Sequence, residues 1–375
     1  MFTGLRVLEL ASVLAGPSVG QFFAELGAEV IKVENPKTNG DITRSWKTAE
    51  EETDDRSAYF CSCNWGKKSI ALDLTLAADL EVVKKLSNRA DIIIASYKHG
   101  DAERLGVSYP QLSQENPRLI YGQISGYGSD DDRVGYDAVI QAESGFMDLN
   151  GEKNGEPIKM PVALVDVLAG HQLKEGLLLA LLNRERSGQG DLVEVSLIQA
   201  AIASLVNQAT NWLVGGKLPL RQGSAHPNIA PYGEFFTTKD DKRILLAVGS
   251  DKQFEELKQI LNIPNAESFE FSKNHQRVAN RESVNAVIAK KILQLDSHDL
   301  IQKLNNQKIP AGFIQNMKEV FEMPAAKKIV MADAGVKGVR SFVAKSHSLY
   351  APFGVLPPPH FGEHTLEIID SLRVK

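Results

Sequence analysis

The apolar positions at the start of the chain follow two periods, one typical of strands and one typical of helices. Short apolar runs at Arg6–Leu10 and at 28–34 have the length and branched residues of buried strands. Between them, residues 18–26 have helical spacing, with Pro17 suited to the first turn and Gly27 to the C-cap. Together these segments predict a βαβ unit with a parallel strand pair, as in a doubly wound sheet.

The same alternation of strand and helix continues through the first half of the chain. Further strands are expected at 67–74, 92–95, 118–124 and 192–195, with helices between them and a long amphipathic helix at 197–213. The loops at 96–100 and 125–128 follow strands of the predicted parallel sheet. We therefore expect these loops to meet at the carboxyl edge of the sheet, where ligands bind in such folds.

A change of pattern after residue 214 predicts a second domain. Residues 215–231 are rich in Gly, Pro and polar side chains, as in a linker. Beyond them a strand is expected at 244–248, a helix at 276–293, and a last helix at 364–372 after Pro-rich coil. We expect a large domain at 1–190 completed by 331–375, a helix and linker at 191–230, and a small domain at 231–330.

Composition narrows the class of protein without changing this picture. The 375 residues are 43% hydrophobic and 24% charged, and the net charge of −5 leaves no basic field for nucleic acid or an anionic membrane. No apolar run reaches the roughly 18–20 residues of a membrane span, and the start does not resemble a signal peptide. Two closely spaced cysteines, Cys61 and Cys63, suggest a reducing compartment. These features predict a cytoplasmic enzyme or binding protein.

Several familiar motifs are incomplete in this chain. Glu34 stands where a nicotinamide cofactor's ribose would bind, but the turn at 14–20 lacks the G-x-G-x-x-G fingerprint, which argues against a dehydrogenase. Residues 122–126 do not match the nucleophile elbow, and 66–69 lack the upstream glycine of a phosphate loop. His360 and His364 lack further ligands in the sequence, so we expect neither a metal site nor a permanently bound cofactor.

One carboxylate, Asp166, lies among small and apolar residues just before a strongly apolar helical run. It has two interpretations. As an N-cap, it would accept the free N–H groups of the first helical turn. As a nucleophile or base, it would lie at the carboxyl end of a strand, where α/β folds place their chemistry. Local sequence favours the cap, and His171 is interpreted as a polar helix residue rather than a general base.

Cationic and aromatic residues lie on several of the predicted loops. Each cation alone is typical of a solvated surface charge. Together with the two tyrosines they would suit a phosphorylated adenine ligand. The residues are Lys37, Lys67, Tyr97, Lys98, Arg104 and Tyr136.

The sequence resembles the family III CoA-transferases, the group that includes formyl-CoA transferase, carnitine CoA-transferase and α-methylacyl-CoA racemase. The resemblance covers essentially the whole chain, in the family's order, and rests on the set of motifs rather than on one of them. The matching stretches are 4–10 (GLRVLEL), 15–17 (AGP), 26–34 (LGAEVIKVE), 40–44 (GDITR), 67–74 (KKSIALDL), 104–106, 116–121, 125–128 (SGYG), 165–166, 169–170, 230–232, 248–251 and 309–312 (IPAG).

The resemblance implies both a fold and a chemistry. It implies an α/β fold with a Rossmann-like large domain, a smaller α+β domain, and two subunits that interlock as a homodimer. In that family the aspartate at the position of Asp166 is the nucleophile, which exchanges CoA between an acyl-CoA and a carboxylic acid through an anhydride and an aspartyl-CoA thioester. Trp46 matches an aromatic residue near the reacting groups. The implied CoA contacts are Leu14, Ala15, Lys37, Lys67, Ser96, Tyr97, Lys98, Arg104, Arg133 and Tyr136.

Three departures from the family pattern bear on the substrate and the reaction. Formyl-CoA transferases have a glutamine where this chain has Leu14, and a run of glycines where it has 248–251, so we expect a larger or more apolar acid than formate or oxalate. Racemases have a Gly-His-Asp triplet, and Tyr136 replaces the histidine here. A transferase is therefore favoured over a racemase, and a CoA-binding regulator without chemistry is the alternative from another class.

Overall fold

The computed structural model describes residues 1–264, 271–345 and 354–373, and these form two compact units. Unit 1 comprises Met1–Phe146, Lys159–Val206 and Ala325–Lys375, and unit 2 comprises Met147–Ile158 and Asn207–Pro324. The segment 331–375, expected to complete the large domain, lies partly outside the described residues.

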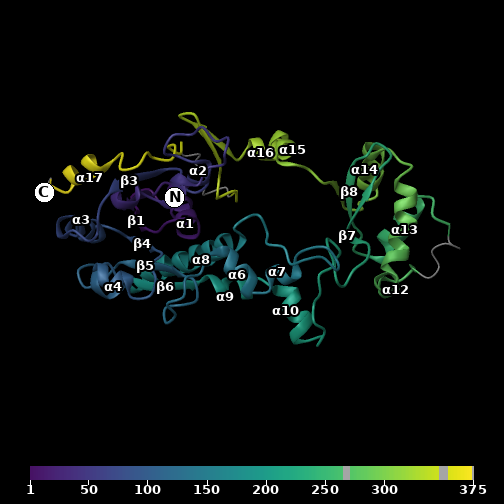
Figure 1. Cartoon of the computed structure of the whole chain (residues 1–375), viewed down its shortest axis with the longest axis horizontal. Coiled ribbons are helices and arrows are strands. Elements are labelled where there is room, and N and C mark those ends of the chain that lie inside the picture. The colour runs from purple at the N-terminus through teal and green to yellow at the C-terminus, as the bar shows by residue number, and fades with distance from the viewer. Residues whose placement is uncertain (265–270, 346–353, 374–375) are drawn as a thin grey trace. The chain divides into compact units, whose positions relative to one another are not determined.

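A six-stranded parallel sheet forms the centre of unit 1 (Figure 1), and its strand order is β3-β2-β1-β4-β5-β6. The strands are β1 (Arg6–Leu10), β2 (Glu29–Glu34), β3 (Lys67–Ala71), β4 (Ile92–Ala95), β5 (Ile120–Ser125) and β6 (Asp191–Ser196). All four residues of the central strand β4 are buried, as expected for a sheet covered on both faces. The order reverses direction between β1 and β4, which makes a switch point where α/β proteins bind ligands.

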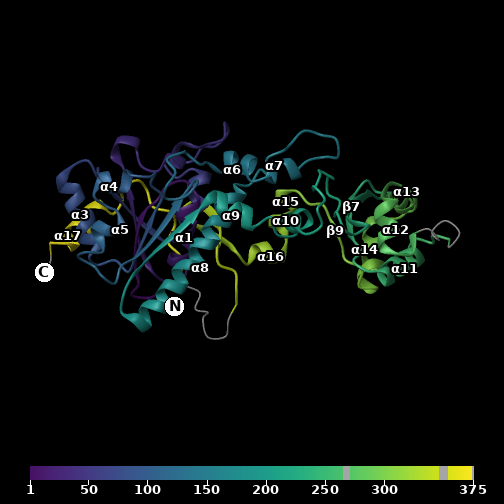
Figure 2. The same cartoon turned by 90° about the horizontal axis from the view of Figure 1, so that it is seen from below.

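Helices cover both faces of this sheet (Figure 1 and Figure 2). One face packs against α1 (Ala15–Glu25), α6 (Asp137–Glu143), α8 (Leu164–Ser187) and α9 (Leu197–Ala203). The other packs against α3 (Ala77–Ser87), α4 (Asp101–Leu105), α5 (Tyr109–Leu112) and α17 (Thr365–Ser371). Strand β1 contributes Val7 to the first core and Leu8 to the second, because successive side chains point to opposite faces.

Shorter elements complete unit 1 and its border. They are η1 (Pro36–Thr38), η2 (Ile42–Ser45), α2 (Ala58–Cys61), α7 (Phe146–Leu149), α16 (Pro324–Lys327) and the antiparallel pair β10 (Val330–Asp333) and β11 (Val336–Val339). Of these, η1, η2 and α2 lie in the connection that follows β2. Helix α17, near the C-terminus, joins the same unit as the N-terminal strands.

Unit 2 has an antiparallel sheet of three strands in the order β7-β8-β9. These strands are β7 (Tyr232–Thr237), β8 (Arg243–Ala247) and β9 (Ala311–Phe313). Its helices are α10 (Val206–Leu213), α11 (Asp251–Ile260), α12 (Asn274–Ala279), α13 (Arg281–Ile292), α14 (Ser297–Asn306) and α15 (Met317–Glu322). A separate apolar core, which includes Phe254, Ile288 and Leu304, packs the three strands against α11, α13 and α14.

Two helices that the sequence predicts as continuous are each divided in two. The helix expected at 197–213 breaks between α9 and α10, where Val206 has a left-handed φ of 42° that an α-helix cannot continue through. The helix expected at 276–293 breaks at Asn280, which lies between α12 and α13. The division into units also differs from the expected boundary at 190, since β6 pairs with β5 and α9 packs on the same sheet.

Candidate active site

The carboxyl edge of the parallel sheet collects the loops that carry most of the predicted site residues. These loops follow β1, β2, β4 and β5. Helix α8 precedes β6 in the chain and lies back across the sheet, so its first turn lies at this same edge (Figure 1). The edge therefore brings the first turn of α8 to the place where a ligand of this fold would bind.

Asp166 lies inside the first turn of α8. The N-cap is Ala163, so the interpretation of Asp166 as the cap is wrong, and the described residues at 150–163 form no strand from which Asp166 could follow. Asp166 is 7% exposed. Burial, followed by the negative charge of Asp137, raises the pKa of Asp166 to about 7. At neutral pH the carboxyl group is thus close to half ionised and poorly solvated, which favours nucleophilic attack when it ionises.

Asp137 performs the capping role that the sequence suggested for Asp166. It begins α6, and its Oδ1 accepts the backbone N–H of Val165 at 2.8 Å, one of the free donors in the first turn of α8. Its Oδ2 accepts the side-chain amide of Gln141 at 2.7 Å. One carboxylate therefore fixes the start of α8 and places a negative charge beside Asp166.

Gly170 allows α8 to approach the first turn of α1 closely. A Cβ atom at Gly170 would lie 2.6 Å from Ser18 Oγ and 3.1 Å from the carbonyl oxygen of Ala15. Asp166 is four residues earlier in α8 and therefore occupies the same face of the helix. Asp166 thus lies on the face of α8 that packs against α1.

Tyr59 is an aromatic neighbour of this carboxylate that no motif in the sequence selects. Burial, then the charge of Asp166, raises the pKa of Tyr59 to about 12, so its phenol stays protonated at physiological pH. Trp46 meets Tyr59 edge to face, with the ring centroids 5.1 Å apart. Since Trp46 is exposed and Tyr59 partly buried, the two rings form an apolar wall that extends from the surface toward Asp166.

The turn between β1 and α1 has an unusual backbone. Val13 has a φ of 72°, a left-handed conformation that is rare for a β-branched residue and costs about 1–3 kcal/mol. Its N–H donates to both carboxylate oxygens of Asp41, at 3.3 and 3.2 Å. Its carbonyl accepts the thiol of Cys63 at 3.4 Å, and burial raises the pKa of that thiol to about 11, so the proton is retained.

Lys67, one of the predicted CoA contacts, lies in the interior instead. It is 1% exposed, and its Nζ donates to Glu9, to the carbonyl of Pro17 and to Asn64, at 2.8 to 3.0 Å. Its ammonium group is fully occupied as a structural ion, so it has no free surface on which CoA would lie. We do not retain Lys67 among the CoA contacts.

The other predicted cations are at the surface, where a ligand would reach them. Lys37 is exposed and pairs with Asp73 at 2.8 Å, and Arg104 is exposed and pairs with Asp101 at 2.8 Å. Both cations face solvent, so a phosphate group would reach them, although Asp73, unlike Asp101, is itself buried. Lys98 is also exposed, in the loop after β4.

Two residues beside Lys98 have partly structural roles. Ser96 Oγ accepts the N–H of Ser12 at 3.2 Å and so links the loop after β4 to the turn after β1. Tyr97 packs partly buried against the second core of unit 1, and its burial raises the pKa of its phenol. Leu14, the N-cap of α1, is half-buried, and Ala15, the first residue of that helix, is buried.

The loop after β5 is closed by two glycines in contact. A Cβ atom at Gly126 would lie 2.6 Å from the Cα atom of Gly135, so only glycine permits this approach. Within the loop, Arg133 stacks over Tyr127 at 3.7 Å and is bonded to Asp131. Tyr136 follows as the N-cap of α6 and is exposed. Arg133 and Tyr136 are thus on the surface of a well-defined loop.

The acidic residue at the end of β2 is unavailable to a nicotinamide cofactor. Glu34 is buried and accepts two hydrogen bonds from Arg44, at 2.8 and 2.7 Å, and a third from Ser69 at 2.6 Å. Arg44 also stacks over Phe60 at 3.7 Å. Because its oxygens are already paired in the interior, Glu34 is not free to bind a ribose.

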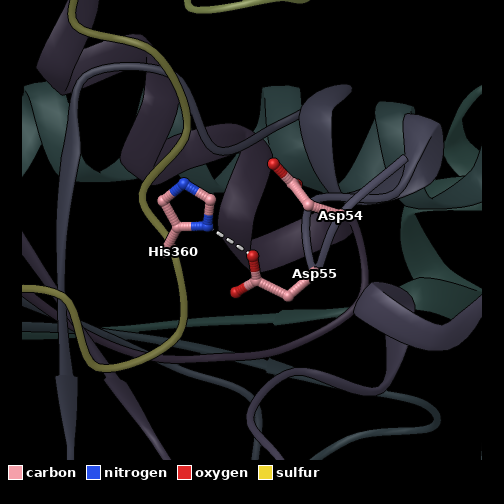
Figure 3. A group of neighbouring side chains, drawn as sticks. All are labelled: Asp54, Asp55 and His360. Carbon is pink, nitrogen blue, oxygen red and sulfur yellow. Dashed lines mark hydrogen bonds and ion pairs between the residues drawn. The ribbon is translucent and has the colours of Figure 1, made fainter.

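His360 has two carboxylates near it, which the sequence did not predict. Asp54, Asp55 and His360 gather in one place (Figure 3), close enough for one ligand atom of each to lie within 4.8 Å of the others. The carboxylates are already engaged, however, because Arg56 binds Asp54 with two nitrogens and Arg44 donates to Asp55 at 3.2 Å. The cluster is an ion-paired link between the loop near 54 and the C-terminal segment.

The remaining histidine predictions concern helix residues. His171 is exposed on α8, five residues after Asp166 and so on a different face of the helix. His364 accepts the N–H of Ser69 at 3.3 Å, which is a structural contact with β3.

In the described part of the chain, no helix combines the length and apolar character of a membrane span.

Comparison with known proteins identifies the family. The family described as CoA-transferase family III matches residues 2–365, almost the whole chain. The chain belongs to this family. Its α/β fold, its parallel sheet and its activity as a CoA-transferase are therefore those expected from the motifs.

Two family III relatives and one solved structure are highly similar to the chain. Succinate–glutarate CoA-transferase of Agrobacterium fabrum is 37% identical and covers 99% of this chain and 95% of its own. Succinyl-CoA:glutarate CoA-transferase of Mus musculus is 33% identical, over 98% of this chain and 86% of its own. A CAIB/BAIF family protein from Brucella suis has a TM-score of 0.86 at 37% identity, with 99% of each chain covered.

In this CoA-transferase, three residues near Asp166 or near the turn after β1 were not predicted as site residues from the sequence. Asp137 was visible only as the last residue of the Gly135–Asp137 triplet, and Asp41 only as part of the motif at 40–44. Tyr59 has no motif at all. Their roles depend on contacts between segments far apart in the chain, which spacing does not reveal.

Proposed function

We propose that Asp166 is the nucleophile of a CoA-transferase that moves CoA from an acyl-CoA to a carboxylic acid. The observation that carries the proposal is a buried carboxyl group, with a pKa of about 7, in the first turn of α8 at the carboxyl edge of the sheet. The two family relatives support the overall reaction through their names. The role of Asp166 itself rests on its burial, its position and its match to the family's aspartate.

The chemistry proceeds by two exchanges on one carboxylate. Ionised Asp166 attacks the thioester carbonyl, the C–S bond breaks, and a mixed anhydride and CoA thiolate result. The thiolate attacks the aspartyl carbonyl, which releases the donor acid and leaves an aspartyl-CoA thioester. The acceptor carboxylate attacks this thioester and forms a second anhydride, and the thiolate then attacks its acyl carbon. These steps release the new acyl-CoA and regenerate Asp166.

The CoA contacts that we propose lie on the loops at the carboxyl edge. Lys37 and Arg104 would bind phosphate groups, because both are exposed cations on loops at the carboxyl edge. Ser96, Tyr97 and Lys98 would lie beside the adenine, and Arg133 and Tyr136 are further contacts. The start of α1, at Leu14 and Ala15, would line the pantetheine arm, since α8 and Asp166 pack on that side.

The acceptor and donor that we propose are dicarboxylic acids of the succinate and glutarate class. The two relatives are named for these acids, and each covers nearly the whole chain. Leu14 also favours these longer acids, since an apolar side chain there offers no hydrogen bond to a small acid such as oxalate. The aromatic pair of Trp46 and Tyr59 gives the wall near Asp166 an apolar surface that suits a methylene chain.

Subunit state and location follow the family pattern in this proposal. We expect an interlocked homodimer, supported by apolar side chains left exposed on α8 and α9, namely Leu178, Leu179, Leu182 and Ile202. We expect a cytoplasmic protein, supported by two cysteines that are free and buried. Light scattering after size exclusion measures the first expectation, and a mass near that of one chain would contradict it.

The central test is Asp166→Ala with succinyl-CoA as donor and glutarate as acceptor. The expected result is loss of CoA exchange, with Glu175→Ala, an exposed carboxylate on the same helix, as a control that keeps it. Hydroxylamine added during turnover should leave a hydroxamate on the peptide that contains Asp166. Retained turnover in a folded Asp166→Ala protein would overturn the nucleophile role. Replacing glutarate with oxalate, formate or acetate then measures the selectivity for the acid.

A further inference from the structure

The strained turn after β1 is held by three separate segments of the chain. The N–H of Ser12 donates to Ser96 Oγ, the carbonyl of Val13 accepts the Cys63 thiol, and the N–H of Val13 donates to Asp41. Since Val13 has a left-handed φ of 72°, the turn would relax toward an ordinary conformation if these contacts were lost. Asp41 supplies the only charged contact among these three.

Asp41 is itself fixed by contacts that leave it little freedom. It is 4% exposed, and Lys32 pairs with it at 2.9 Å. Thr43 donates to the same carboxylate from its N–H at 3.0 Å and from its hydroxyl at 2.9 Å. Lys32 is anchored in turn to Glu9 on β1, at 3.0 Å, so the position of the carboxylate is set by the sheet.

The turn leads directly into the part of α1 that meets α8. Leu14, the residue after Val13, is the N-cap of α1, and Ala15 and Ser18 lie against Gly170 of α8. Asp166 occupies the same face of α8, one turn earlier. A change in the path of the turn would therefore move the backbone beside the proposed nucleophile.

We propose that Asp41 is a positioning residue for the CoA transfer reaction, which holds the strained turn at Val13 so that the start of α1 stays in register with Asp166. Asp41 acts through the Val13 N–H and does not touch the substrate. This inference rests on the proposed role of Asp166. The alternative is that Asp41 only stabilises the fold as one member of a buried ion network.

The experiment compares Asp41→Asn with a control that removes an equivalent buried charge elsewhere. Glu25→Gln is matched, because Glu25 is 4% exposed and accepts two backbone N–H groups, from Ser341 at 2.8 Å and Phe342 at 3.1 Å. Asparagine keeps the volume of Asp41 but removes its charge and leaves one acceptor oxygen for Val13, Thr43 and Lys32, where the carboxylate offers two. We expect kcat to fall by about 10- to 100-fold, since a displacement of about 1 Å near the reacting groups costs about 100-fold. We expect KM for the acyl-CoA to change by less than about 3-fold, because ground-state binding is kept.

A second substitution, Val13→Gly, separates positioning from stability. Glycine adopts a positive φ without strain, so the turn would no longer depend on Asp41. In the Asp41→Asn background, Val13→Gly should recover at least about 5-fold of kcat, and its effect in the native background should be smaller, as in a double-mutant cycle. Glu25→Gln should lower the melting temperature without a comparable loss of kcat.

Other outcomes overturn the proposal. Unchanged kcat in folded Asp41→Asn would make Asp41 a structural residue only. The same conclusion follows if Val13→Gly gives no recovery, or if Glu25→Gln lowers kcat as much as Asp41→Asn does. These results are distinct from failure of the proposed function. That failure would appear as turnover retained in Asp166→Ala, whatever the effect of Asp41→Asn on kcat.

Discussion

Asp137 accepts the backbone N–H of Val165, and its negative charge acts on the carboxyl group of the next residue, Asp166. The hydrogen bond and the charge have separate consequences. The bond, at 2.8 Å, fixes the first turn of α8 and hence the position of Asp166. The charge opposes ionisation of Asp166 and adds to the larger effect of burial. Geometry and acidity at this site are therefore controlled by the same side chain.

Replacing Asp137 by asparagine should shift the acid limb of the pH profile. Asp166 must be ionised to attack, so kcat/KM should rise with pH through about 7, the pKa of Asp166. Asp137→Asn keeps an acceptor for the Val165 N–H but removes the negative charge, so the limb should move to lower pH. The shift should be partial, because burial is the larger cause. A limb that stays in place, or moves to higher pH, would contradict this assignment.

Asp166→Asn should make the protein more stable at neutral pH while abolishing turnover. The folded-state pKa of about 7 is above the ordinary value of 3.8, so the folded protein holds a proton that the unfolded chain has lost. Stability from this group is therefore present at low pH and is lost as the pH rises through about 7. Asparagine removes that cost, which we expect to be about 2–4 kcal/mol at pH 8.

Thermal unfolding across pH measures this effect. The melting temperature of Asp166→Asn should exceed that of the native protein at pH 8, and the difference should shrink as the pH falls toward 5. Glu175→Gln, on the exposed face of the same helix, is the control and should show no such trend. A difference that is constant with pH would mean that ionisation of Asp166 is not its cause.

Gly170→Ala should separate α8 from α1 and lower activity. Its Cβ atom would meet Ser18 Oγ and the Ala15 carbonyl oxygen, and the latter is backbone that cannot rotate away. We expect a loss of about 1–3 kcal/mol in stability from overpacking and a fall in kcat of about 10- to 100-fold from displacement of Asp166.

Gly176→Ala is the matched control for Gly170→Ala. It changes the same helix, but its Cβ atom would meet the side chain of Val193 on β6, which lies away from α1. Steady-state kinetics and thermal unfolding of both variants provide the comparison. Equal losses of kcat in the two would show that the contact between α8 and α1 has no special role.

Lys67 and Lys37 should respond to substitution in opposite ways. Lys67→Met leaves a buried Glu9 with one cation fewer, so we expect about 3 kcal/mol of destabilisation and unchanged affinity for CoA in the folded protein. Lys37→Ala removes the cation beside the buried Asp73, which keeps its hydrogen bonds from Thr75, so the melting temperature should fall less than in Lys67→Met. Its affinity for CoA should fall, and the fall should lessen at high salt. Calorimetric titration with CoA would contradict both assignments if only Lys67→Met weakened binding.

The sheet was predictable because its strands follow local patterns. Strand β1 and strand β4 were placed at the residues where they occur, since apolar runs bounded by turn signals need no distant partner to be identified. The two helix breaks were harder to predict from the sequence than the strands. Val206 and Asn280 lie within continuous helical periodicity, and the breaks occur where their backbone angles depart from those of an α-helix.

The candidate site was only partly readable from the sequence. The resemblance selected Asp166 as nucleophile, which stays a prediction, while local chemistry favoured a cap that Asp137 provides instead. Lys67 shows that the sequence can also select a residue that the structure places in the interior. A lysine beside a loop has the same local sequence whether it faces water or a buried glutamate. Burial and pairing depend on the whole fold, so the alternatives could not be separated before the structure was known.

The buried pair of Arg44 and Glu34 has a consequence for how this enzyme relates to dehydrogenases with the same strand order. A nicotinamide cofactor needs both a glycine-rich turn after β1 and a free acid after β2. Here the acid is neutralised by a guanidinium that also stacks on Phe60. Restoring the glycines alone would leave the ribose without its partner, and removing Arg44 alone would leave the buried Glu34 without the cation that binds it. No single substitution would therefore give this sheet a nicotinamide site, although the two enzyme classes share its strand order.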